Sequence, residues 1–452
     1  MSNTRRDFLK TSAAIGAAVY VGHKTATADD AGKESPNEKV AYACIGVGGK
    51  GSSDSADAAK HGQIVAICDV DDRTLEKAGT RPGFENAEKF NDFREMLLKL
   101  GDKIDAVTVS TPDHMHAPAT AMAMKLGKAC YTQKPLTHTV WEARRLSDIA
   151  KETGVATQMG NQGTSTDGLR RAAAVLKSGF IGNIKSAHIF TNRPIWPQGG
   201  PRPEPGECPP HVHWDLWLGT APDRPFAPGY HPFAWRGWWD FGTGALGDMA
   251  CHTFNMPFAG LHLANPHTIQ AWCSGHNKDS YPQSSKIAFE FDNPSGEGLM
   301  PVYWYDGGNM PEESLLNGLE KGFRHKSGSI IVGEKYTLYS WADYGDNWVI
   351  IDGDGKEVPA PEVEFEKSPG HFTELHQTIT GERKEAMSNF ANYGGPLTET
   401  ILLGNLAVFA AAEGESKKIE WDSKNLTCPN APELASIVKK DYRDNYGEYL
   451  DA

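Results

Sequence analysis

Residues 237–255, GWWDFGTGALGDMACHTFN, place an acid and a base at helical spacing. Asp248 and His252 lie four residues apart, so on an α-helix their side chains share one face and can reach the same atom. Such a pair can transfer a proton or begin a metal site. The structural alternative is that Asp248 caps the helix and His252 is a satisfied, half-buried histidine. Metal is the weaker chemical hypothesis, since no HExxH motif or cysteine cluster supplies further ligands.

A glycine pattern earlier in the chain predicts a dinucleotide site. Gly46, Gly48 and Gly51 form G-x-G-x-x-G between an apolar run and a helix-compatible segment, SDSADAAKHG. In this setting the first glycine permits a tight turn, the second admits the pyrophosphate, and the third lets the helix pack closely. Asp69 ends the next apolar run, where its carboxylate can bind ribose hydroxyls and would repel a 2′-phosphate. NAD is therefore favoured, and Arg73, one helical turn later, keeps NADP as the alternative.

The alternation of strands and helices continues and predicts a doubly wound parallel sheet of the Rossmann type. Further strands are expected at 104–112, 128–135 and 155–161, with helices at 116–127 and 139–154. Ligands bind at the carboxyl ends of such strands. Besides the glycines and Asp69, the predicted cofactor contacts there are Thr111, Pro112, His116, Lys134 and Gln162.

The whole chain is long enough for two domains and does not have the charge of a nucleic-acid binder. Its 452 residues exceed one compact core, and a formal net charge of −13 leaves no basic footprint for a phosphate backbone. Seven cysteines form no CxxC pair. Cys44, Cys68 and Cys130 lie in apolar runs, so no disulfide framework is implied.

The N-terminus has the three parts of an export signal in order. TRRDFLK, residues 4–10, carries twin arginines, and a mildly apolar run and a small-residue ATA follow at 11–28. The apolar run is too short to span a bilayer. We interpret 1–28 as a twin-arginine signal and 29–38 as a linker, which predicts a periplasmic or otherwise exported protein.

Together these motifs resemble the Gfo/Idh/MocA oxidoreductases, the family of glucose–fructose oxidoreductase and inositol dehydrogenase. The resemblance covers the glycine fingerprint, STPDHMH, a Lys-Pro pair and the Asp-x-x-x-His of 237–255. It implies that Lys134, Asp248 and His252 line the catalytic pocket beside the nicotinamide. This chain has Gln133 where the family pattern has Glu, which puts the charge partner of Lys134 in doubt.

The resemblance also implies a second domain with a large, open, mainly antiparallel sheet, and strand-like runs support it independently. In SKIAFEFD, residues 285–292, apolar side chains alternate as in a half-buried strand. Aromatic residues on both faces of VYWY suggest that the outer face is covered, and the family's dimers and tetramers make another subunit the natural cover. The expected domains are 39–160 (NAD-binding), 161–430 (substrate-binding and oligomerisation) and 431–452 (C-terminal helical tail).

These assignments predict a hydride transfer between NAD and a secondary hydroxyl of a sugar, sugar derivative or cyclitol. His252, titrating near neutrality, would be the base, Lys134 would stabilise the alkoxide, and Asp248 would position the groups. The predicted substrate contacts are Asn161, His231, Arg236 and Trp238. Two alternatives remain: a redox-neutral glycoside hydrolase or lyase that uses NAD transiently, and a non-enzymatic sugar-binding protein.

Overall fold

The structure, a computed structural model, describes residues 39–296, 298–443 and 445–451. The predicted signal at 1–28 and the predicted linker at 29–38 lie outside the described residues. The first part of the described chain is a parallel sheet in the order β3-β2-β1-β4-β5-β6. Its strands are β1 (Ala41–Ile45), β2 (Gln63–Cys68), β3 (Glu88–Phe90), β4 (Ala106–Val109), β5 (Ala129–Gln133) and β6 (Thr157–Gly160). This order confirms the predicted Rossmann sheet.

Helices connect these strands and begin where capping side chains allow. They are α2 (Gly49–His61), α3 (Asp72–Gly79), α4 (Phe93–Leu100), α5 (His116–Lys125) and α6 (Val140–Thr153). Asp71 and Asp92 cap α3 and α4, and Thr139 forms a capping box with Glu142 at α6. The predicted strands are longer than the observed ones because their polar ends form the loops of the carboxyl edge.

The second sheet is mixed, with the order β14-β13-β12-β11-β7-β10-β9-β8-β15. All its pairings are antiparallel except that of β10 with β7, as predicted for a mainly antiparallel sheet. The strands are β7 (Ile184–Phe190), β8 (Thr268–Cys273), β9 (Ser285–Asp292), β10 (Leu299–Tyr305), β11 (Gly328–Gly333), β12 (Thr337–Trp341), β13 (Asn347–Ile351), β14 (Glu357–Val358) and β15 (Ile419–Glu420). Part of the outer face is covered by this chain itself, where Leu316 and Leu319 pack on Tyr305 and Tyr339.

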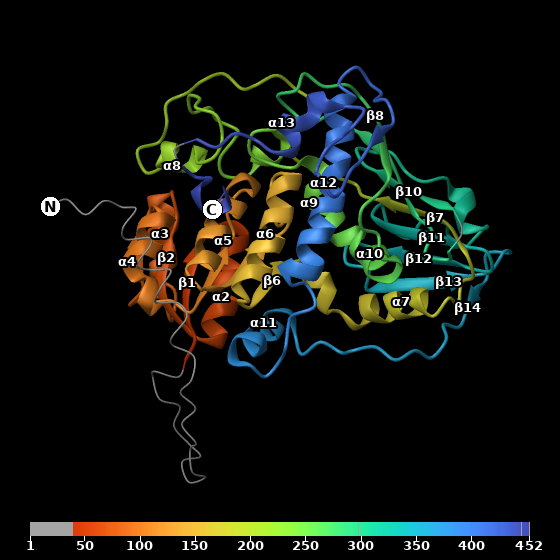
Figure 1. The fold of residues 1–452 in the computed structure, drawn as a ribbon, viewed down its shortest axis with the longest axis horizontal. Coiled ribbons are helices and arrows are strands. Elements are labelled where there is room, and N and C mark those ends of the chain that lie inside the picture. Colours follow the sequence, from red (N-terminus) through yellow and green to blue (C-terminus); the bar gives the residue numbers. More distant parts are fainter. Residues whose placement is uncertain (1–38, 297, 444, 452) are drawn as a thin grey trace, which may run out of the picture. The chain divides into compact units, whose positions relative to one another are not determined.

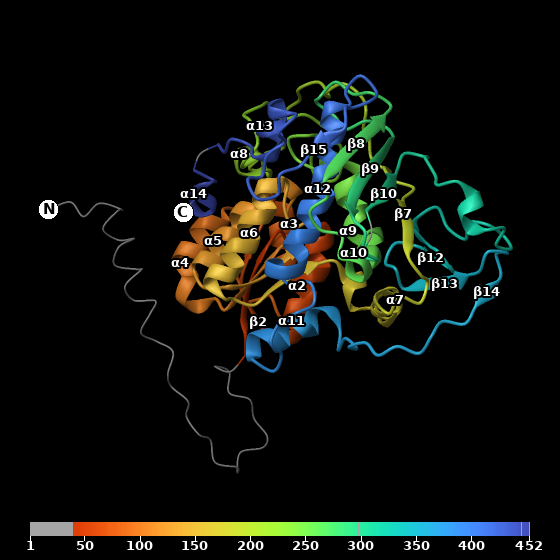
Figure 2. The same cartoon turned by 45° about the vertical axis from the view of Figure 1, so that its right-hand side comes forward.

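Helices fill the space between the two sheets. The apolar α12 (Gly395–Ala410) packs against α6 and β8 and lies between the two sheets in both views (Figures 1 and 2). It also contacts α9 (Gly244–Thr253), where a Cβ on Gly404 would lie 2.7 Å from Leu246 and 2.9 Å from Phe289. Glycine at this position therefore lets α12 approach α9 and β9 closely. No helix in the described residues is long and apolar enough to cross a membrane.

Residues 193–242, which we call the cover segment, run past the carboxyl edge of the first sheet. They contain only the short α8 (Trp214–Leu218) and a 3-10 turn, so 193–213 form a long loop. The segment has an aromatic cluster of its own, made by Trp217, Tyr230, Trp235, Trp238 and Phe241 with smaller side chains. It joins the first sheet just after β2, where backbone hydrogen bonds link 211–213 to 70–72.

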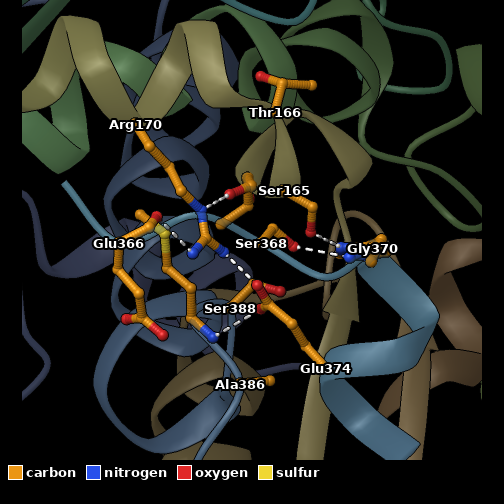
Figure 3. A network of polar contacts seen from close by, with 12 residues as sticks. Ser165, Thr166, Arg170, Glu366, Ser368, Gly370, Glu374, Ala386 and Ser388 are labelled. Atoms are coloured by element: carbon orange, nitrogen blue, oxygen red, sulfur yellow. Dashed lines mark hydrogen bonds and ion pairs between the residues drawn. The ribbon is translucent and has the colours of Figure 1, made fainter.

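A buried ion pair holds α7 and α11, which are about 200 residues apart in the sequence, against each other. Arg170 of α7 (Asp167–Lys177) meets Glu374 of α11 (His371–Thr380), and their side chains are 4% and 1% exposed. Arg170 also donates to the carbonyl oxygens of Thr164 at 2.9 Å and Glu366 at 3.1 Å. Figure 3 shows the guanidinium enclosed by these acceptors. Because Glu366 lies between β14 and α11, these contacts hold that connecting segment against α7.

Removing the charge of Glu374 should strongly destabilise the fold. Glu374→Gln leaves the Arg170 guanidinium buried without a counter-charge, and breaking such a pair costs about 3–5 kcal/mol. The matched control is Glu357→Gln at the exposed Arg324–Glu357 pair, whose carboxylate side chain is 52% exposed and whose loss should cost about 1 kcal/mol or less. Urea unfolding of both variants measures the difference. Equal destabilisation by the two substitutions would contradict the structural role of the buried pair.

Candidate active site

A cavity of about 590 Å³ lies at the carboxyl ends of β1, β2, β4 and β5. It is where the strand order reverses on either side of β1, the position at which doubly wound sheets bind ligands. The predicted site residues that line it are Gly46, Gly48, Asp69, Thr111, Pro112, His116, Lys134, His231, Arg236 and Asp248. The cavity therefore brings together the predicted cofactor site and most of the predicted catalytic groups.

The glycine turn has the shape required for a dinucleotide. Gly46 adopts φ +76°, and a Cβ there would lie 2.6 Å from the carbonyl oxygen of Ser110. A Cβ on Gly51 would lie 2.0 Å from the carbonyl oxygen of Gly46, so α2 can start beside the turn only with glycine. Gly51 does not line the cavity; its part is this helix packing. The N-terminus of α2 is left open to a pyrophosphate, and the residues present fit the group.

Asp69 closes the cofactor end of the cavity. Its two carboxylate oxygens accept hydrogen bonds from the backbone N–H groups of Val47 and Asp71, each at 3.0 Å. The same carboxylate thus braces the glycine turn and lines the cavity, where lone pairs remain for ribose hydroxyls. Arg73 is exposed and does not line the cavity, so the arrangement favours NAD.

Lys134 finds its charge partner in Asp248, across the two domains. The Lys134 ammonium donates to the Asp248 carboxylate at 3.0 Å and to its carbonyl oxygen at 2.7 Å. Arg236 donates to the same carboxylate at 3.1 Å. Burial by itself would raise the pKa of Asp248, but the charges of Lys134 and Arg236 lower it to about 2. Asp248 lies inside α9 and so does not cap it.

His252 is deeply buried beside this ion pair. Its ring packs edge-on against Tyr344, 4.9 Å between centroids, and its Nδ1 has no hydrogen-bond partner among the described residues. Burial, with the positive charge of Lys134 nearby, lowers the pKa of His252 to about 3. The expectation that it titrates near neutrality is therefore wrong. His252 is a neutral imidazole at physiological pH, able to accept a proton but a weaker base than expected.

Asn161 is a second buried side chain with unused hydrogen-bonding capacity. It is fully buried, and neither amide atom has a partner in the described part of the chain. Its neighbour Gly163 packs on Tyr344, the residue that contacts His252. Buried polar groups are normally paired, so the unpaired atoms of Asn161 and His252 are exceptions among the described residues. Neither residue lines the main cavity, and Gln162 does not line it either.

His116 positions the site through the backbone. Its two ring nitrogens lie 2.8 Å from the carbonyl oxygens of Thr111 and Pro135. The ring is buried, and burial lowers its pKa to about 4. His116 therefore lies between the loop after β4 and the loop that carries Lys134, and its neutral ring donates its single N–H to one of the two carbonyl oxygens.

Two predicted substrate residues, Trp238 and His231, differ in their access to the cavity. Trp238 is packed in the aromatic cluster of the cover segment, with its ring 5.3 Å from that of Tyr230, and does not reach the cavity. His231 lines the cavity at its cofactor end, 3.3 Å from the Asp71 carboxylate. Trp238 is packed in this cluster because an aromatic residue in a long loop is drawn into whichever core the loop forms, and the substrate contacts of Trp238 and His231 stay predictions.

Other lining residues were given no role by the sequence. Asp113 is buried, accepts a 2.6 Å hydrogen bond from Thr243, and has a pKa raised by burial to about 7. Lys50, in the glycine turn, and Phe233 and Tyr446 also line the cavity. The position of Asp113 after a predicted strand could have identified it as a lining residue. Tyr446 could not have been identified in this way, because it lies near the C-terminus, far from the other lining residues in the sequence.

Comparison with known families agrees with this geometry. Residues 40–161 match the model described as "Oxidoreductase family, NAD-binding Rossmann fold", and 175–295 match its C-terminal alpha/beta domain. The chain belongs to the Gfo/Idh/MocA oxidoreductase family. Residues 2–21 match the twin-arginine translocation signal sequence, which supports export of this Gfo/Idh/MocA protein by that route.

Individual relatives of this Gfo/Idh/MocA protein include enzymes of two kinds. It is 25% identical over 160 residues to a D-xylose 1-dehydrogenase [NADP(+)] of Haloarcula marismortui, covering 34% of this chain and 44% of the relative. It is 28% identical over 179 residues to a glycosyl hydrolase family 109 protein of Shewanella pealeana, covering 34% and 38%. The chain thus spans less than half the length of these relatives.

Among solved structures, the fold is shared with an inositol dehydrogenase homolog of Azotobacter vinelandii complexed with NADH and myo-inositol. The TM-score is 0.56 at 15% sequence identity, covering 85% of this chain and 98% of that one. At this identity the likeness concerns the fold.

The ring of His252 should stay neutral over the working range of pH. Its folded pKa of about 3 lies below the usual 6.5, so the folded imidazole binds its proton only in strong acid. Acidification from about pH 6.5 towards 3 therefore favours the unfolded state at this residue. Nitrogen-15 NMR of labelled histidines, with His252→Asn to assign the signal, measures the titration. A midpoint near 6.5 would contradict the buried, unpaired ring.

Proposed function

We propose that the protein is an NAD-dependent oxidoreductase that transfers hydride between a tightly held nicotinamide cofactor and a secondary hydroxyl of a sugar, sugar derivative or cyclitol. The observation that carries the proposal is the Lys134–Asp248 ion pair in the cavity that also contains the glycine turn and Asp69. One chamber thus offers a nucleotide cradle and a cation at the place where an alkoxide would form.

Different residues have different roles in the proposed oxidation of an alcohol. The glycine turn and Asp69 would hold NAD, which would supply the hydride acceptor for this oxidation. The Lys134 ammonium stabilises negative charge on the substrate oxygen, and neutral His252 accepts its proton at the unpartnered Nδ1. Asp248, ionised between two cations, holds Lys134 and Arg236 in place. Asn161 offers its unpaired amide to a neighbouring hydroxyl.

The mouth of the cavity suits a carbohydrate. Arg236 stacks on Trp235 and Phe233, with 4.2 and 4.8 Å from its guanidinium carbon to the ring centroids. Aromatic faces beside a planar hydrogen-bond donor match a sugar, which has apolar C–H faces and a rim of hydroxyls. A non-enzymatic sugar-binding protein would not require the lysine, aspartate and histidine that this chain retains.

A second candidate is a redox-neutral glycoside hydrolase or lyase. Oxidation of a ring hydroxyl acidifies the neighbouring C–H, the aglycone leaves by elimination, and return of the hydride restores the cofactor; a hydrolase adds water before that return. Three observations favour it: the family 109 relative, the export signal, and a cavity bordered on one side by the cover segment. A periplasmic enzyme meets no free NAD pool, so a retained cofactor that is regenerated in each cycle suits that compartment. We also infer a homodimer or homotetramer formed through the second sheet.

Turnover assays on purified protein separate these candidates. Nucleotide released on denaturation should be NAD, and NADP dominance would contradict the role of Asp69. Sugars, cyclitols and aryl glycosides are then screened for ketone and for free aglycone: ketone indicates net oxidation, and aglycone without net reduction of NAD indicates the redox-neutral cycle. Lys134→Met and His252→Ala should each lower kcat by about 10²–10⁴. The double variant should lose much less than the product of these losses, because both groups serve one step.

Export should depend on the two arginines of the signal. Changing Arg5 and Arg6 to Lys removes the twin-arginine pair and should leave folded, active protein in the cytoplasm. Cell fractionation followed by immunoblotting and an activity assay measures the distribution. Undiminished export of the double variant would show that another route is used.

A further inference from the structure

We propose that Asp54 is a positioning residue of the active site, which holds the Lys50 ammonium at the cavity to bind substrate and fixes Gln133 beside Lys134. The inference rests on the proposed function, because it assigns Lys50 to the substrate of that same cavity. It also explains why this chain has Gln133 where the family pattern has a carboxylate.

The carboxylate of Asp54 joins three elements of the site at one point. It projects from α2 and is 1% exposed. It accepts hydrogen bonds from Lys50 at 2.7 Å, Ser110 at 2.8 Å and Gln133 at 2.9 Å. Ser110 follows β4 and Gln133 ends β5, so Asp54 links the helix of the glycine turn to both strand ends that border the cavity. A buried carboxylate with three donors is fully satisfied.

The geometry around Gln133 requires an amide rather than an acid. Its Nε2 atom points at Asp54, and a Cβ on Gly160 of β6 would lie 2.5 Å from that atom. The side chain therefore lies flat over Gly160 and cannot turn away easily. A glutamate at 133 would place a second buried carboxylate against Asp54, and like charges in that setting repel strongly. In this chain the carboxylate at this point therefore comes from α2 and not from the strand.

Lys50, which donates to Asp54, lines the cavity itself. Its side chain is 44% exposed and lines the cavity with Lys134 and Asp248. Its positive charge also acts on His252 and on His371, where it helps to lower the pKa of both rings after burial and other nearby groups. Lys50 therefore lies towards the catalytic groups. The ammonium donates to Asp54 at 2.7 Å and to Ser53 at 2.9 Å, so one of its three N–H donors remains for a substrate hydroxyl or carboxylate.

Four variants of the holoenzyme test the two contacts. Lys50→Met should raise the KM for the sugar or glycoside found in the screen about tenfold, the loss of one charged hydrogen bond, with kcat little changed. Asp54→Asn should raise KM similarly because it releases Lys50. Gln133→Glu should lower the melting temperature, and Asp54→Asn/Gln133→Glu should regain most of that loss, because the donor and acceptor are exchanged.

The control for Lys50→Met is Lys60→Met on the same helix, at the exposed Lys60–Asp57 pair, which should change neither KM nor stability. An unchanged KM in Lys50→Met, or an Asp54→Asn variant that melts lower at unchanged KM, would overturn the positioning role. Additive melting losses in the double variant would overturn the Asp54–Gln133 exchange. These melting measurements need no turnover, so they remain decisive if wild-type protein produces neither ketone nor aglycone, the result that contradicts the proposed function itself.

Discussion

The active site depends on one buried ion pair, Lys134–Asp248, which joins two domains at 3.0 Å. Each side chain is 15% exposed, so neither charge would be tolerated there without the other. Arg236 adds a second cation to the same carboxylate. Asp248 is therefore shared by two cations, and both of them line the cavity.

The surrounding structure holds the side chains of Lys134 and Asp248 in position. On the Rossmann side, His116 bridges the backbone of the two strand-end loops, and Asp54 ties both of those ends to α2. On the other side, α9 is held by α12, whose Gly404 allows the close approach. Because each contact is short and buried, small displacements are costly. Rigidity of this kind suits a reaction that requires fixed distances.

The cover segment explains how a long loop can be part of an ordered site. Its aromatic residues form a small core of their own, and its backbone pairs with the chain beyond β2. This cluster brings Arg236, Phe233 and His231 to the wall of the cavity. An enclosed cofactor is compatible with both oxidation and a redox-neutral cycle, since each begins with the same hydride transfer.

Local sequence determined the elements and the glycine turn. Strand alternation in SKIAFEFD, the helix at 371–380 and the φ of Gly46 are set by neighbours in the chain, so they could be predicted. Only the tertiary structure decided the partner of Lys134, 114 residues away, the exchange of charge between Gln133 and Asp54, and the burial that keeps His252 neutral. It also placed Trp238 in a core instead of the cavity. Pairing and pKa depend on desolvation and on groups from distant segments, and neither is encoded in local spacing.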